Sequence, residues 1–83
     1  MIPKEITCSH IEKAATEINT NGVPKNRDSR KYLVQIDDAL YPPKYIISLA
    51  GKYMNGQEVD AGIFDATEAR SYLRKLNYII ITK

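Results

Sequence analysis

Cysteine and histidine are almost absent from this chain, and long apolar runs are missing. The single cysteine excludes an internal disulfide, and Cys8 with His10 could hold zinc only with carboxylate help. The longest apolar stretch, residues 78–81, is far too short to form a transmembrane helix. The polar residues that follow Met1 give no signal-peptide pattern, and scarce cysteine favours a cytoplasmic protein. The four glycines fit neither a P-loop nor a dinucleotide-binding fingerprint.

The length and charge indicate one small soluble domain spanning residues 1–83. A chain of 83 residues with 43% hydrophobic and 27% charged residues is typical of a globular domain with a modest core. The net charge of +2 is too small to indicate nucleic acid by itself. Its distribution is uneven, because residues 25–31 hold four cations and one acid, whereas residues 58–68 hold four acids and no cation. We therefore expect a one-sided electrostatic surface.

Three helices are predicted from apolar residues spaced at i, i+3, i+4 and i+7. The first covers residues 8–19, with Ser9 or Thr7 as its N-cap, and Asn21-Gly22 ends it. The second begins at Pro43 or Lys44 and ends at Asn55-Gly56, and the third follows an Asp65/Glu68 capping box and ends at Asn77. The apolar stripes are Ile11, Ala14, Ala15 and Ile18; Ile46, Leu49, Ala50 and Tyr53; and Ala69, Tyr72, Leu73 and Leu76.

Short β-branched and aromatic segments predict the strands. Residues 32–36 form one strand, Asp37-Asp38-Ala39 a turn, and Leu40-Tyr41 a short returning strand that Pro42 and Pro43 stop. Residues 78–81 form a terminal strand, whose continuous apolar character predicts burial on both faces or a central place in the sheet. The order α-β-β-α-α-β indicates an α+β fold, with three helices packed on a two- or three-stranded sheet.

No group of residues in the sequence indicates catalysis, a metal site or a cofactor. Cys8 and His10 lie two residues apart on one helical turn, so their side chains point about 200° apart and cannot act as nucleophile and base. Asp37 and Asp38 are adjacent at a hairpin tip, where such residues usually form the turn. We therefore expect this chain alone not to be an enzyme.

The best candidate contact surface is one face of the second helix with the basic loop before it. Lys44, Ser48 and Lys52 are stacked at i, i+4 and i+8, and Gly51 beside them permits close approach to a DNA backbone. Lys44 lies at a helix N-terminus, which attracts phosphate even without a lysine. The loop adds the further candidate residues Lys25, Arg27, Ser29, Arg30 and Lys31. The alternative, that these lysines are simply solvated, stays open.

Six tyrosines suggest a second mode of contact, the stacking of bases on aromatic rings. Tyr53 and Tyr72 lie on the apolar stripes and are expected in the core. Tyr32 lies in a strand and can face either way. Tyr41 adjoins the Pro-Pro turn, so we expect it to pack against the prolines first and to contact a ligand second.

The chain resembles the N-terminal head domain of McrA-like, modification-dependent endonucleases of the HNH type. The resemblance covers roughly residues 6–82 and is most specific in the segment Tyr41-Pro42-Pro43-Lys44 with its helix. Asp65-Ala66 and Asn77-Tyr78 replace the Gly-Gly and Gly-Phe pairs usual in that family. Further matching residues are Arg27, Ser29, Lys31, Tyr32, Gly56, Phe64, Glu68, Ala69, Leu73, Leu76, Ile79 and Ile80. The resemblance implies a DNA-associated accessory module without nuclease motifs of its own.

Two functional hypotheses follow. The first is a non-catalytic DNA-binding module that contacts the DNA backbone, of modified duplex in particular, within a restriction-like nuclease system. The second is a protein-interaction or structural head domain that organises a partner nuclease in cis or in trans. The second hypothesis predicts self-association and an exposed apolar patch of Ile47, Met54 and Tyr45.

Overall fold

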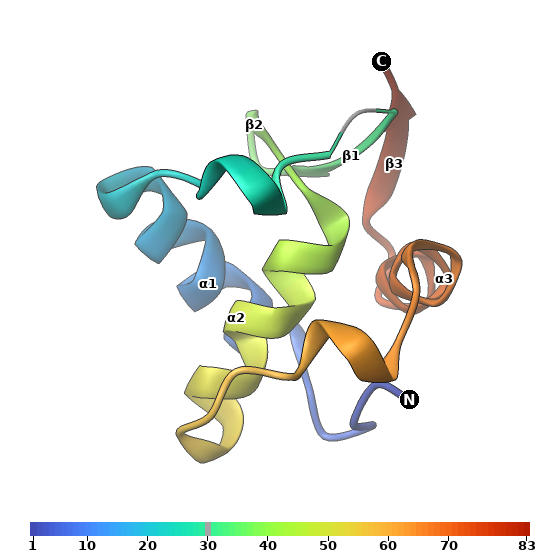
Figure 1. Ribbon diagram of the computed structural model, residues 1–83. Coiled ribbons are helices and arrows are strands. Elements are labelled where there is room, and N and C mark those ends of the chain that lie inside the picture. Colours follow the sequence, from blue (N-terminus) through green and yellow to red (C-terminus); the bar gives the residue numbers. More distant parts are fainter. Residues whose placement is uncertain (30) are drawn as a thin grey trace.

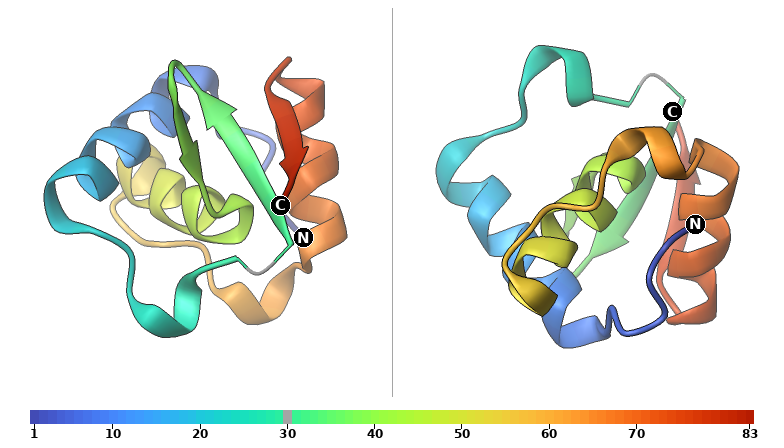
Figure 2. Two further views of the ribbon diagram at one scale, coloured as in Figure 1. Left: turned by 90° about the horizontal axis from the view of Figure 1, so that it is seen from above. Right: turned by 60° about the horizontal axis from the view of Figure 1, so that its bottom comes forward.

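The computed structural model describes residues 1–29 and 31–83 as three helices beneath a three-stranded antiparallel sheet (Figure 1). The element order α-β-β-α-α-β and the α+β class predicted from the sequence are confirmed, and the sheet has three strands. Two short 3-10 turns, η1 (Lys25–Arg27) and η2 (Ala61–Ile63), interrupt the loops before β1 and α3. Seen from above, the strands lie in front of α1 and α2, so one face of the sheet is left without helices (Figure 2).

Helix α1 (Cys8–Asn21) begins at the earlier of its two expected caps. Thr7 is the N-cap, and its backbone N–H donates to Nδ1 of His10 at 3.1 Å. This local bond satisfies a backbone group at the end of the helix, and it gives His10 a structural role. The stripe of Ile11, Ala14, Ala15 and Ile18 is buried as predicted.

Helix α2 (Pro43–Asn55) is the central helix, because it packs against both α1 and α3. Pro43 stands at its first position and Gly56 takes the left-handed conformation at its end, with φ of 90°. The middle of the helix is buried all round, because Ile47, Ser48 and Gly51 are enclosed together with Ile46, Leu49 and Ala50. Tyr53, expected in the core, is 37% exposed, since the helix emerges from its neighbours near its C-terminus. The prediction of a single apolar stripe was therefore too narrow.

Gly51 is needed for contact within the protein. A Cβ atom at this position would lie 2.6 Å from Cγ2 of Val59 and 3.0 Å from the backbone oxygen of Gln57. The loop after α2 is bonded to the helix at this point, because the backbone N–H of Val59 donates to the carbonyl oxygen of Ser48 at 3.0 Å. The close approach that Gly51 permits is thus made by residues 57–59, which leaves no room there for DNA.

Helix α3 (Ala66–Lys75) begins at the predicted N-cap, where Oδ1 of Asp65 accepts a hydrogen bond from the backbone N–H of Glu68 at 2.8 Å. The Glu68 carboxylate does not complete the capping box, because its Oε2 accepts from the backbone N–H of Ile2 at 2.9 Å. Asn77 follows the helix with φ of 72°, in the left-handed conformation expected for a residue at this place.

The sheet has the order β2-β1-β3, in which both pairings are antiparallel. Strands β1 (Tyr32–Ile36) and β2 (Ala39–Tyr41) form the predicted hairpin, with Asp37 at φ of 54° in its turn. Strand β3 (Ile79–Thr82) is an edge strand, and Ile79 is 60% exposed. The predicted central, doubly buried position for this strand was wrong, because β1 occupies the centre and only alternate residues of β3 face the helices.

Candidate nucleic-acid interface

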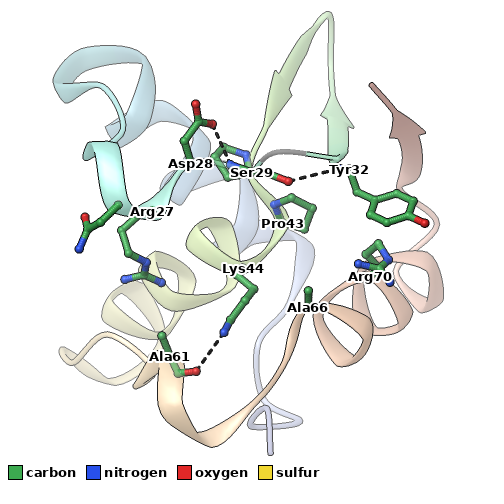
Figure 3. A pocket seen from close by; sticks show the side chains of 11 residues that line it. Arg27, Asp28, Ser29, Tyr32, Pro43, Lys44, Ala61, Ala66 and Arg70 are labelled. Carbon is green, nitrogen blue, oxygen red and sulfur yellow. Dashed lines mark hydrogen bonds between the residues drawn. The ribbon is translucent and has the colours of Figure 1, made fainter.

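A cleft of about 330 Å³ lies where the loop before β1, the start of α2 and the start of α3 come together. Figure 3 shows that its labelled side chains come from these separate segments. Among the described residues, the cations that line it are Arg27, Lys44 and Arg70, and the lining carboxylate is that of Asp28. Apolar groups fill much of the remaining wall: Tyr32, Pro42, Pro43, Ala61 and Ala66.

Arg27, at the end of η1, is held by a residue in the core. Its Nη2 donates to Oγ of Ser48 at 2.9 Å, and its guanidinium carbon lies 5.0 Å from the centroid of the Tyr45 ring. Ser48 has 0% exposure, so the expectation that it belongs to an outer contact face was wrong. The helix turns this hydroxyl inward, where a buried polar group requires a partner and Arg27 supplies it.

Lys44 lies in the first turn of α2 and is half-buried. Its Nζ donates to the carbonyl oxygen of Ala61 at 3.1 Å and lies 5.2 Å from the centroid of the Phe64 ring. The first contact comes from η2, whose Ala61 lines the cleft (Figure 3), and the second comes from the residue directly after η2. The ammonium group is therefore held at the cleft, and Lys44 lies at the helix N-terminus where the sequence predicted it.

Arg70 is the cation that the sequence did not single out. It lies on α3, and its guanidinium carbon is 4.0 Å from the centroid of the Tyr32 ring on β1 (Figure 3). The sequence does not mark an arginine on the polar side of an amphipathic helix as a binding residue, because solvated arginines occur in the same pattern. Only the packing of α3 beside the sheet brings Arg70 to the same cleft as Arg27 and Lys44.

The N-terminus of α2 adds a fourth positive feature. Pro42 is the N-cap, and no side chain caps the helix. Pro42 and Pro43 have no N–H, so the first turn offers the backbone N–H groups of Lys44 and Tyr45, which together with the helix dipole favour an anion at this end. Pro42, Pro43 and Lys44 all line the cleft, so this helix end faces it. The Asp28 carboxylate accepts a bond from the backbone N–H of Ser29 at 2.8 Å.

The other predicted contact residues are dispersed. Ser29 lines the cleft, whereas the exposed Lys25 and Lys31 lie outside its lining, and Arg30 lies outside the described residues. Tyr41 is 4% exposed and donates its hydroxyl hydrogen to Oδ1 of Asn19 at 2.8 Å. A direct ligand contact by Tyr41 was therefore a wrong expectation, because β2 points this ring into the core.

Lys52, two turns beyond Lys44, belongs to a separate interaction between α1 and α2. Its Nζ lies 2.8 Å from Oε1 of Glu17, which also accepts from the Tyr53 hydroxyl at 2.7 Å. The hydrogen bonds from Lys52 and then Tyr53 lower the pKa of Glu17, and the same carboxylate raises the pKa of Lys52. Lys52 is thus engaged with an acid and does not extend the cleft along the helix.

Within residues 1–29 and 31–83, no group of three or more acidic, histidine or cysteine side chains is arranged to hold a metal ion. None of the helices in that part of the chain has the length and apolar character needed to cross a membrane. No protein-family model, curated protein or solved structure matches this chain. The resemblance to the McrA-like head domain therefore stays a prediction.

Proposed function

We propose that this protein is a non-catalytic DNA-binding module that holds phosphate in the cleft of Arg27, Lys44 and Arg70. The observation that supports the proposal is the convergence of three cations from three segments on one cleft, beside an uncapped helix N-terminus. Positively charged side chains and helix N-termini are the groups that position proteins on DNA phosphates. The further role, as an accessory module of a restriction-like nuclease, is supported by the sequence resemblance alone, and a cytoplasmic location by the scarcity of cysteine.

The exposed lysines enlarge the proposed interface without forming the cleft. Lys25 lies on η1 and Lys31 directly precedes β1, so both flank the segment that carries Arg27 and Ser29. Because the contacts of exposed lysines with phosphates are not directional, these two residues would strengthen attraction to any duplex. The cleft would hold one phosphate in a fixed position.

Salt dependence of duplex binding tests the proposal. Three neutralised phosphates give a log–log salt slope of about 2.7 between about 50 and 200 mM salt. Replacing Lys44 by alanine is expected to reduce this slope by about 1. Lys13→Ala is the matched control, because Lys13 is an exposed lysine on α1 and outside the cleft lining. Fluorescence anisotropy of labelled duplexes, unmodified and cytosine-modified, gives the slopes.

Two results would contradict the DNA proposal. One is no binding to either duplex at low salt and tens of micromolar protein. The other is equal slopes for the wild type and Lys44→Ala, since a cation that neutralises a phosphate must change the number of released counterions.

A second candidate function, docking on a partner protein, is favoured by the uncovered face of the sheet. Gln35 on β1 is paired with Leu40 on one side and with Ile79 on the other, so these three side chains share a face. Leu40 is 48% exposed and Ile79 is 60% exposed. The expected patch of Ile47, Met54 and Tyr45 was wrong, because Ile47 is fully buried and the other two pack against the core.

A further inference from the structure

The cleft is larger than a single phosphate contact requires. A backbone phosphate of a paired duplex can be held by cations on an open surface, since the bases stay stacked inside the helix. The cleft instead encloses about 330 Å³, a volume within the range of sites that take small molecules. If only phosphate entered, most of this hollow would hold water.

The walls of the cleft divide into a charged part and an apolar part. Arg27 and Lys44 lie with the uncapped start of α2, and this part suits a phosphate. Tyr32, Pro43 and Ala66 provide apolar surface. A small number of fixed polar groups on a mostly apolar wall is typical of sites that bind an organic ligand in one orientation.

The stacked pair of Tyr32 and Arg70 supplies a planar surface within the apolar part. The guanidinium carbon lies 4.0 Å from the ring centroid, so the two groups are in direct contact. Figure 3 shows this pair on the side of the cleft opposite Arg27. Nucleobases stack on tyrosine rings and on guanidinium planes, and this stacking tolerates any base.

We propose that the cleft holds one unpaired nucleotide of a DNA strand. The base packs against the Tyr32–Arg70 pair, and its phosphate lies near Arg27, Lys44 and the N-terminus of α2. This inference rests on the proposed DNA-binding function and narrows it. A strand end, a single-stranded stretch or a nucleotide extruded from a duplex all present such a unit, whereas a fully paired duplex does not.

The experiment compares three labelled DNAs of equal length by anisotropy: a paired duplex, the same duplex with one unpaired central nucleotide, and the single strand. The wild type is expected to bind the two DNAs with unpaired nucleotides about tenfold more tightly than the paired duplex, the size of one stacked base. Tyr32→Leu is expected to abolish that preference. Tyr53→Leu is the control, since Tyr53 is an exposed tyrosine outside the cleft.

The outcomes separate this inference from the broader proposal. Equal affinity of the wild type for all three DNAs, with a reduced salt slope for Lys44→Ala, would overturn the nucleotide site and leave phosphate binding intact. Absence of binding to all three would overturn both. Displacement of the strand by an equal concentration of a free deoxynucleoside monophosphate would overturn the assignment to DNA and identify a small-nucleotide site. Because the wild type alone shows the preference, a Tyr32→Leu variant that fails to fold does not prevent a decision.

Discussion

Ser48 has a different role in the structure from the one that its position in the sequence suggested. In the sequence it stands between two lysines at helical spacing, as one of three residues of a contact face. In the structure it is fully buried, and its hydroxyl accepts a hydrogen bond from Arg27. We infer that Ser48 positions the guanidinium of Arg27 at the cleft and touches no ligand itself.

Ser48→Ala is expected to weaken DNA binding only through Arg27. Loss of one internal hydrogen bond costs about 1 kcal/mol of stability. In a double-mutant cycle of DNA affinity, Ser48→Ala should weaken binding in the wild-type background and have no effect in an Arg27→Ala background. Residues that share one hydrogen bond commonly show coupling of about 0.5–3 kcal/mol. An equal loss in both backgrounds would show that Ser48 acts independently of Arg27.

Helix α2 illustrates how the packing of one element restricts its sequence. The helix is enclosed by α1, α3 and the loop that follows it. Even Gly51, which has no side chain, is in close contact with that loop. Glycine is unfavourable inside a helix, but residues 57–59 pack directly on the backbone of Gly51 and leave no room for a side chain. The close packing decides which residue is tolerated here.

Gly51→Ala is expected to destabilise the fold. Alanine raises helix propensity by about 1 kcal/mol, but overpacking against the backbone of Val59 typically costs about 1–3 kcal/mol and often more where backbone must move. Gly62→Ala is the matched control, since its Cβ would find its nearest atom at 3.4 Å and the backbone is not left-handed. Urea unfolding of the two variants measures the difference. A Gly51→Ala protein as stable as the wild type would contradict the packing described here.

Taken as one molecule, the protein has two surfaces with different chemistry. The basic cleft lies among the loop before β1, α2 and α3, whereas Leu40 and Ile79 lie on the outer face of the sheet. The register places this outer face opposite the buried residues Val34 and Tyr41. The two candidate functions therefore occupy different faces and can be tested separately.

Ile79→Gln is expected to leave duplex affinity unchanged and to remove any self-association. The uncharged replacement adds no attraction to phosphate and takes away apolar area that docking would bury. Sedimentation velocity at rising concentration measures association, with Ile63→Gln as a control that removes an isoleucine of similar exposure from η2. A wild type that stays monomeric would contradict self-association through the sheet.

Sequence reasoning succeeded where a feature depends on neighbours along the chain. The strand Tyr32–Ile36, the Asp65 N-cap and the helix ends at Gly56 and Asn77 were all predicted, because backbone preferences and capping bonds act within a few residues. The fold class followed from the order of these elements. The position of β3 in the sheet could not be predicted, because a run of isoleucines is compatible with a central strand and with an edge strand beside a helix.

The local pattern of residues therefore determined the helices, the hairpin and the basic character of the loop before β1. Tertiary structure decided which cations meet: it turned Ser48 inward, paired Lys52 with Glu17 and brought Arg70 to Arg27 and Lys44. The physical reason is that a side chain's environment depends on close packing between segments far apart in the chain. Periodicity within one helix cannot report how many neighbours that helix has.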